Sequence, residues 1–177
     1  MIHIAHATKW YGSQQVVKDV SLTIQKHTLT TLIGSNGAGK STLLSLIGRL
    51  IEGEGTFFLE DRDIASYRGN DLAKRLAMLK QTNHLAVRLT IKELVRFGRF
   101  PYSKTRLTQE DEAIVEQAID YMDLKQFEHK YLDQLSGGER QRAMIAMVIA
   151  QNTDYILLDE PLNNLDMAHS VHIMKLL

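Results

Sequence analysis

Apolar and polar residues alternate in the first part of the chain, and this alternation predicts short strands with one buried face each. The alternating apolar positions are Ile2, Ile4, Val20, Leu22 and Ile24. A further strand is predicted over residues 56–59, because an apolar run there follows the turn residues Gly53-Glu54-Gly55. The N-terminal part should therefore form a small β subdomain.

Two segments predict buried strands: residues 29–33 are β-branched or aliphatic, and residues 155–158 form a continuous apolar run that suits a parallel strand buried on both faces. Leu29–Ile33 leads into a glycine-rich segment, and Tyr155–Leu158 leads into Asp159 and Glu160. The carboxyl ends of parallel strands form the edge where α/β sheets bind ligands. Both runs should therefore deliver polar residues to a binding edge.

Apolar residues at helical spacing predict four helices. One follows Lys40, a second covers residues 70–79, a third begins at Thr108 with carboxylates in its first turn, and a fourth covers residues 143–150. Strand signals are few between His84 and Leu135. We expect this stretch to be a helical insertion in an α/β unit.

A glycine-rich segment fits the phosphate-binding pattern G-x-x-x-x-G-K-[ST] at every specified position. It consists of Gly34, Ser35, Asn36, Gly37, Ala38, Gly39, Lys40, Ser41 and Thr42. The glycines leave space for a row of backbone N–H donors, and the following helix directs its positive end at the phosphates. Lys40 can reach the β- and γ-phosphates, and Ser41 is placed to ligate magnesium. The alternative is a glycine turn that binds nothing.

Three other features are candidates for nucleotide chemistry, each with a plainer alternative. Tyr11 could stack on a purine or pack as an ordinary edge aromatic. Ser136, Gly137 and Gly138 open a helix and could cradle an anion, or simply cap that helix. Asp159 could hold magnesium and Glu160 could polarise a water, or both could end a strand in an acidic turn.

Composition narrows the class of protein. The chain has 177 residues, which suits one α/β unit with an inserted lobe, and 21 basic side chains balance 21 acidic ones. A nucleic-acid partner held by a general positive field is therefore unsupported. There are no cysteines, the first residues lack a secretory signal pattern, and the longest apolar stretch, 143–150, cannot span a bilayer.

The order of the motifs resembles that of the ATP-binding cassette (ABC) ATPases. The resemblance covers the glycine loop, Gln81, the segment Leu135–Arg142 and the apolar run ending in Asp159-Glu160. It implies an α/β P-loop NTPase core with a mostly parallel sheet, an N-terminal antiparallel β subdomain and an inserted α-helical subdomain. We expect a single ABC ATPase domain over 1–177, with the core in 1–83 and 136–177 and the helical subdomain in 84–135.

The same resemblance implies a role for each matching residue. Tyr11 stacks on adenine, and Gly34–Thr42 with Lys40 holds the phosphates of ATP. Gln81 and Asp159 contact Mg²⁺, and Glu160 is the general base. Ser136 to Gly138 contact the γ-phosphate of the ATP bound on the opposite protomer. Asp166 belongs to the loop 163–166, through which the protomers communicate. Without the resemblance, a Gln at position 81 is more often a solvated loop residue than a catalytic one.

The implied partners follow from this composite site. A second ATPase protomer would meet the first head to tail with ATP between them, and hydrolysis would release it. The resemblance also implies an integral membrane permease, a substrate-binding protein that acts indirectly, no nucleic acid, and a peripheral place on the cytoplasmic face of the membrane.

A finer resemblance concerns the transported substrate. Phe97–Tyr102 and Leu162–Asp166 are similar to segments of ATPases from iron–siderophore, haem and cobalamin importers, the second particularly to iron–siderophore members. Two other functions stay open: a soluble ABC ATPase acting on ribosomes or DNA, and a nucleotide-binding fragment without turnover.

The sequence departs from the family pattern in two places. Lys26-His27-Thr28 stands where a glycine is usual, and His27 tolerates a positive φ better than a β-branched residue does. Only 11 residues (177 − 166) follow Asp166, whereas the family continues to a switch histidine. His169 and His172 come too soon for that role, so we expect a C-terminally truncated chain whose own turnover is uncertain.

Overall fold

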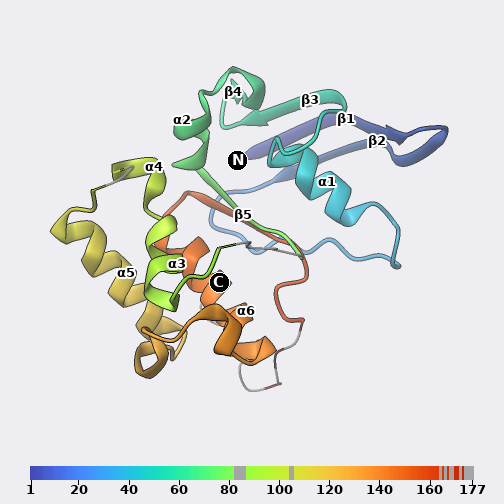
Figure 1. Cartoon of the computed structure of the whole chain (residues 1–177). Helices are drawn as coiled ribbons and strands as arrows, with labels where there is room; N and C mark the ends of the chain where they lie inside the picture. The colour runs from blue at the N-terminus through green and yellow to red at the C-terminus, as the bar shows by residue number, and fades with distance from the viewer. Residues whose placement is uncertain are drawn as a thin grey trace. The chain divides into compact units, whose positions relative to one another are not determined.

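The computed structural model describes residues 1–81, 87–103, 106–163, 165, 167, 170, 171 and 173. It divides into two compact units, Met1–Leu72 and Ala73–Leu177. The first unit is built mainly on strands and the second mainly on helices (Figure 1).

The first unit contains a four-stranded antiparallel sheet in the order β2-β1-β3-β4. The strands are β1 (Ile2–Tyr11), β2 (Gln14–Ile24), β3 (Glu54–Leu59) and β4 (Arg62–Asp63). Ile2 pairs with Ile24 on one side and with Leu59 on the other. The strands predicted from alternation and over residues 56–59 are confirmed.

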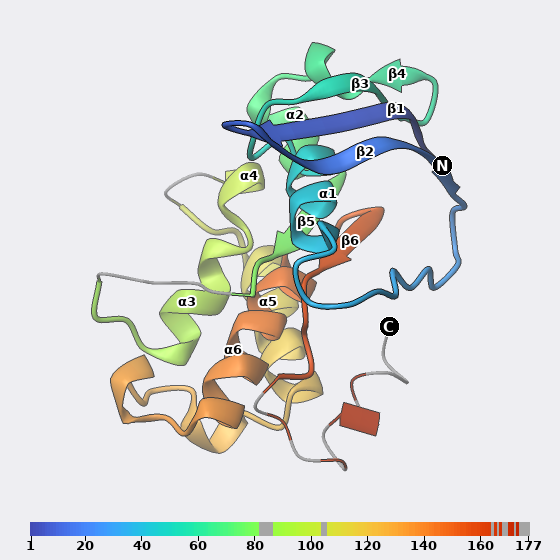
Figure 2. The same ribbon diagram turned by 90° about the vertical axis from the view of Figure 1, so that its right-hand side faces the viewer.

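Helix α1 (Lys40–Ile47) buries its apolar side in this unit, and Figure 2 shows it beneath β1 and β2. Leu46 lies so close to Gly53 that a Cβ added there would come within 2.6 Å of Leu46 Cδ2 and 2.9 Å of the Thr8 carbonyl. α1 ends at Ile47, and Leu50, three residues further on, is exposed. A short 3₁₀ turn, η1 (Ile64–Ser66), and α2 (Gly69–Ala73) follow the sheet.

The strand predicted over Leu29–Ile33 is wrong. No described strand pairs with this segment, and the side chains of Leu29 and Ile33 are 61% and 92% exposed. An apolar run forms a buried strand when neighbouring strands take up its backbone N–H and C=O groups and other elements cover its faces. Neither condition is met here, so composition alone misassigned the segment. His27, just before it, does adopt a positive φ of 58°.

The second unit contains the parallel pair β5 (Leu76–Leu79) and β6 (Tyr155–Leu158), with Leu76 opposite Tyr155 and Leu79 opposite Leu158. The predicted strand at 155–158 is confirmed. The helix predicted over 70–79 is wrong, because α2 ends at Ala73 and the next apolar run is β5. Pairing with a partner 79 residues away overrides the helical spacing of its leucines.

Helices surround this pair and share one apolar core. They are α3 (Ile91–Phe97), α4 (Phe100–Ser103), α5 (Gln109–Tyr121), α6 (Gly137–Ala150) and two 3₁₀ turns, η2 (Lys125–Phe127) and η3 (Leu132–Gln134). Leu94, Ile119 and Ile145 are fully buried where α3, α5 and α6 pack together. Within the described part of the chain, no helix has the length and apolar character needed to cross a bilayer.

Three helices of this unit begin with a capping box, in which the first side chain and a carboxylate three residues later satisfy each other's backbone N–H groups. The pairs are Thr90 with Glu93 in α3, Thr108 with Asp111 in α5, and Ser136 with Glu139 in α6. The helix start predicted at Thr108 is thus confirmed. Each capping box thus provides hydrogen-bond acceptors for backbone N–H groups that would otherwise lack partners at the helix N-terminus.

Candidate functional site

The glycine loop of the first unit depends on glycine at specific positions. Gly37 and Gly39 have φ values of 79° and 89°, which side chains disfavour. A Cβ on Gly39 would also lie 2.7 Å from the Val16 carbonyl oxygen. The chain can therefore turn into α1 at this point because Gly39 has no side chain.

The start of α1 is open and positive. Gly39 is the N-cap residue and provides no side-chain cap, and the first turn holds no acidic residue. Lys40 Nζ donates to the carbonyls of Gly34, at 2.8 Å, and Ser35, at 2.9 Å, so the ammonium group lies across the loop. Uncapped N–H groups at a helix N-terminus beside a lysine form an anion site. These features fit the triphosphate of a nucleotide, and Ser41 stands in the same first turn.

Tyr11 ends β1, at the hairpin that returns through Gly12 into β2. Its ring is 52% exposed, and Lys9 Nζ lies 5.3 Å from the ring centroid. A half-exposed ring of this kind has a face on which a base could stack. Its role in holding adenine stays a prediction.

In the second unit, the ends of β5 and β6 bring polar side chains together, as their parallel direction predicts. Asp159 follows β6, is 6% exposed, and donates its backbone N–H to the Leu79 carbonyl at 3.0 Å. Next to it, Glu160 Oε2 accepts hydrogen bonds from Gln81 Nε2 and Asn163 Nδ2, each at 2.6 Å. Two residues 79 positions apart, Gln81 and Glu160, thus share one site.

The turn after β6 holds Glu160 in an unusual backbone conformation. Glu160 has a φ of 51°, and the next carbonyl, of Pro161, accepts from Gln141 Nε2 at 2.9 Å. Asn163 was predicted only as part of the loop 163–166, and its contact with Glu160 was not predicted, nor was the contact of Gln141 with Pro161. The spacing of Asn163, three residues after Glu160 across a proline turn, is the signal that could have indicated it.

Ser136, the predicted anion contact at the start of α6, is engaged within its own helix. Ser136 Oγ lies 2.8 Å from Glu139 Oε2 and accepts from the Glu139 N–H at 3.3 Å. The Ser136 backbone N–H, donating at 2.8 Å, keeps the pKa of the Glu139 carboxyl below its ordinary value. Gly137 and Gly138 form the first turn. The Glu139 carboxylate therefore lies beside Ser136, the residue that the prediction places against a phosphate.

The predicted residues fall into two sets. Tyr11 and Gly34–Thr42 belong to the first unit, whereas Gln81, Ser136–Gly138, Asp159 and Glu160 belong to the second. Asp166 lies outside the described residues.

Within the described residues there is no cluster of three or more His, Cys, Asp or Glu side chains placed for a metal. A divalent ion would thus depend on mixed ligands such as a hydroxyl, an amide oxygen and one carboxylate, a set that suits Mg²⁺.

Comparison with known proteins gives consistent results. Residues 17–163 match the family described as ABC transporter. The chain is 56% identical to the petrobactin import ATP-binding protein YclP of Bacillus subtilis, covering 100% of this chain and 71% of the relative. It is 52% identical to the petrobactin import ATP-binding protein FatE of Bacillus anthracis, covering 99% and 70%.

Solved structures agree with these sequence matches. A dimeric bacterial ABC transporter cassette superimposes with a TM-score of 0.88 at 29% identity, covering 99% of this chain and 81% of the other. An inward-facing transporter of putative metal-chelate type superimposes with a TM-score of 0.79 at 25% identity, covering 99% and 65%. The predicted fold class, an ABC ATPase fold with an antiparallel β subdomain, is confirmed.

Proposed function

The chain belongs to the ABC transporter family of ATPases, and we propose that it is the ATP-hydrolysing subunit of an importer for iron–siderophore complexes. ATPases of this family bind ATP. The identity of 56% to a petrobactin import protein and of 41% to the iron(3+)-hydroxamate import ATP-binding protein FhuC of Bacillus subtilis supports the substrate class.

In this proposal the first unit holds the nucleotide. The loop Gly34–Thr42 surrounds the phosphates, Lys40 moves from the loop carbonyls to the β- and γ-phosphate oxygens, and Tyr11 stacks on adenine. The open, positive start of α1 supports this assignment, because phosphate would satisfy N–H groups that no side chain caps.

The observation that carries the hydrolytic part is the Gln81–Glu160–Asn163 contact beside buried Asp159. Glu160 would accept a proton from the attacking water, with Gln81 and Asn163 orienting its carboxylate. Ser41, Gln81 and Asp159 would hold Mg²⁺, which neutralises charge on the β- and γ-phosphates. Gln81 uses its amide nitrogen on Glu160, which keeps its amide oxygen for the metal.

The proposed partners complete the motor. A second protomer would place Ser136, Gly137 and Gly138 against ATP bound on the first, and Asp166 would lie in the loop that connects the protomers. An integral membrane permease would receive the force at the cytoplasmic face, with a substrate-binding protein acting through that permease. The dimeric form of a structural relative supports the first of these partners.

Light scattering on Glu160→Gln with and without magnesium-ATP tests the ATPase part. The amide keeps the shape of the side chain but cannot take a proton, so we expect turnover to fall about a thousandfold and an ATP-bound dimer to accumulate. Glu116→Gln, at an exposed carboxylate of the same unit, should behave like the unmodified chain. Full turnover in Glu160→Gln would contradict the assignment of the base.

Growth on a petrobactin-bound iron source tests the importer part. We expect the chain to restore growth to a Bacillus subtilis strain lacking YclP, and Lys40→Met to fail. If the chain hydrolyses ATP but does not restore growth, the ATPase stands and the proposed substrate class is wrong.

A further inference from the structure

The segment Gly98–Tyr102, which runs from the end of α3 into α4, has no part in holding the nucleotide in the function proposed above. The structure places it in the second unit, against the last turn of α6. A Cβ on Gly98 would overlap the Met147 carbonyl oxygen and lie 3.1 Å from the Gln151 nitrogen. Glycine at this position therefore allows the end of α3 to contact the backbone of α6 directly.

Arg99 ties this contact to α5 and to the end of α6. Its Nε donates to Asp111 Oδ1 at 2.8 Å, and its Nη1 donates to the Ala150 carbonyl at 3.0 Å. Arg99 and Asp111 are 5% and 4% exposed. Ala150 is the last residue of α6, and terminal carbonyls of a helix lack partners within the helix and attract a cation. Arg99 thus caps α6 from a neighbouring helix.

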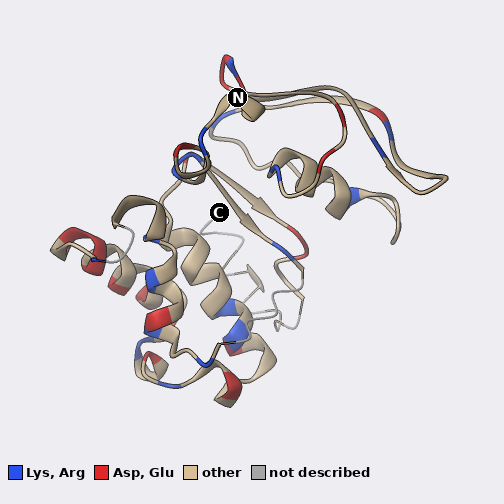
Figure 3. Ribbon diagram, turned by 45° about the horizontal axis from the view of Figure 1, so that its top comes forward, with Lys and Arg blue, Asp and Glu red and all other residues tan. Residues whose placement is uncertain are grey.

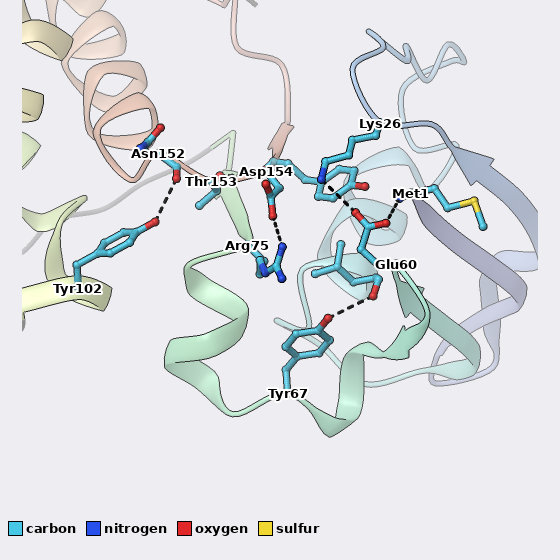
Figure 4. A network of polar contacts seen from close by, with 11 residues as sticks. Met1, Lys26, Glu60, Tyr67, Arg75, Tyr102, Asn152, Thr153 and Asp154 are labelled. Carbon is cyan, nitrogen blue, oxygen red and sulfur yellow. Dashed lines mark hydrogen bonds and ion pairs between the residues drawn. The ribbon is translucent and has the colours of Figure 1, made fainter.

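Tyr102 extends the contact beyond the helix. Its ring lies 3.9 Å from the Arg99 guanidinium, and its hydroxyl donates to the Asn152 carbonyl at 3.1 Å (Figure 4). Asn152 has a φ of 51° and lies in the short connection from α6 to β6. At the far end of this connection, Arg75 pairs with Asp154 at 2.6 Å (Figure 4). The connection is therefore held at successive points.

This connection joins α6 to β6, and the opposite ends of these two elements carry the proposed chemistry. α6 begins after Ser136, and β6 ends just before Asp159 and Glu160. A helix of 14 residues and a paired strand are stiff. The connection between them therefore controls the orientation of α6 relative to β6. We propose that Arg99 and Tyr102 are positioning residues for ATP hydrolysis, which act by fixing the α6–β6 connection; this inference rests on the proposed function.

Other cations offer a matched comparison. Lys92 pairs with Glu116 at 3.3 Å and Arg96 with Glu112 at 2.8 Å, so both join α3 to α5 as Arg99 does. Figure 3 shows basic and acidic residues in colour along the ribbon, with both signs present on the helices of this unit. Within the described part of the chain, Lys92 and Arg96 donate to carboxylates of α5, whereas Arg99 also donates to the last carbonyl of α6. Removing the Arg96–Glu112 pair therefore tests cohesion of α3 and α5 without touching the connection.

The variants are chosen so that they fold. Arg99→Met alone would leave Asp111 buried without its partner, so it is combined with Asp111→Asn, whose amide oxygen can still accept from the Thr108 N–H. Tyr102→Phe removes a single hydroxyl. Arg96→Met with Glu112→Gln is the control. Each is assayed for ATP turnover at saturating ATP, affinity for a fluorescent ATP analogue, and thermal unfolding.

We expect the Arg99/Asp111 double variant to lose about tenfold in turnover and Tyr102→Phe about threefold, since each removes hydrogen bonds that hold the connection. Affinity for the analogue should stay unchanged, because the glycine loop belongs to the other unit. The control should match the unmodified chain. A double variant with a lower melting temperature but full turnover would show a merely structural role and overturn the inference. Absence of turnover in the unmodified chain would overturn the proposed function, and the inference with it.

Discussion

The starts of α1 and α6 are both glycine-containing helix N-termini, yet they differ in charge and in capping. At α1, Gly39 provides no side-chain cap and Lys40 lies over the loop. At α6, Ser136 and Glu139 close a capping box, and the Glu139 carboxylate accepts from the first backbone N–H. The two sites share a sequence character but offer different electrostatics to a phosphate.

The comparison teaches that glycines alone do not make a phosphate site. At α1 the N–H groups and the positive end of the helix face an open loop with a cation, so this end can bind a polyphosphate by itself. At α6 a carboxylate already occupies the favourable position, and a phosphate arriving there must share the site with a negative charge. We infer that α6 contributes to a phosphate site whose main binding energy comes from elsewhere, as the proposed head-to-tail dimer requires.

The largest expected effect comes from removing the cation at α1. Lys40→Met should weaken ATP binding at least about a hundredfold, because a charge-assisted contact to the phosphates is lost. Titration with a fluorescent ATP analogue measures the change. Lys18→Met, at an exposed lysine of β2 in the same unit, is the control and should bind normally. If Lys40→Met bound ATP normally, the charge of Lys40 would not distinguish the start of α1 from the start of α6 as a phosphate site.

A smaller effect is expected from adding a side chain to a glycine of the turn before α1. Gly39→Ala should lower the free energy of unfolding by about 2 kcal/mol or more, since alanine disfavours positive φ and its Cβ meets the Val16 carbonyl. Gly37→Ala has the same φ problem but no heavy atom within 4 Å of the added Cβ, so it should cost about 1 kcal/mol. Urea unfolding compares the two, and equal costs would mean that the close approach to Val16 is unimportant.

The smallest effect concerns the charge at α6. Glu139→Gln should lower the free energy of unfolding by about 0.5 kcal/mol through the helix dipole, and Glu93→Gln in the similar box of α3 should do the same. Only Glu139→Gln should also tighten ATP-driven dimerisation of the Glu160→Gln protein, by about threefold, because it removes a negative charge beside the phosphate. If Glu93→Gln and Glu139→Gln changed dimerisation equally, the charge at the start of α6 would have no specific effect on the phosphate.

The same boxes give a pH dependence with a definite sign. Backbone N–H groups lower the pKa of Glu93 and Glu139 in the folded chain. Their stabilising contribution is therefore complete above about 4.5, the ordinary value of the carboxyl, and is lost as the pH falls from there through the lowered folded value. The Glu139→Gln protein should lose less stability over this interval than the unmodified chain, as urea midpoints at several pH values would show.

Local patterns determined much of the fold. Alternation identified β1 and β2, the continuous apolar run identified β6, and Thr108 with carboxylates behind it identified the start of α5. These features succeed because the residues that specify them are close neighbours in the chain. The glycine pattern likewise located the turn into α1, since positive φ at Gly37 and Gly39 is a local requirement.

Tertiary structure decided the rest. Leu76–Leu79 is a strand because β6 lies beside it, and Leu29–Ile33 is not a strand because no described strand does. Asn163 and Gln81 meet on one oxygen of Glu160, and Arg99 caps a helix that ends 51 residues later. The partners Gln81 and Glu160, and Arg99 and Ala150, are so far apart in the chain that they leave no periodic trace in the sequence. The sequence by itself therefore determined which residues are candidates for the chemistry, whereas folding decided which of them hold one another in place.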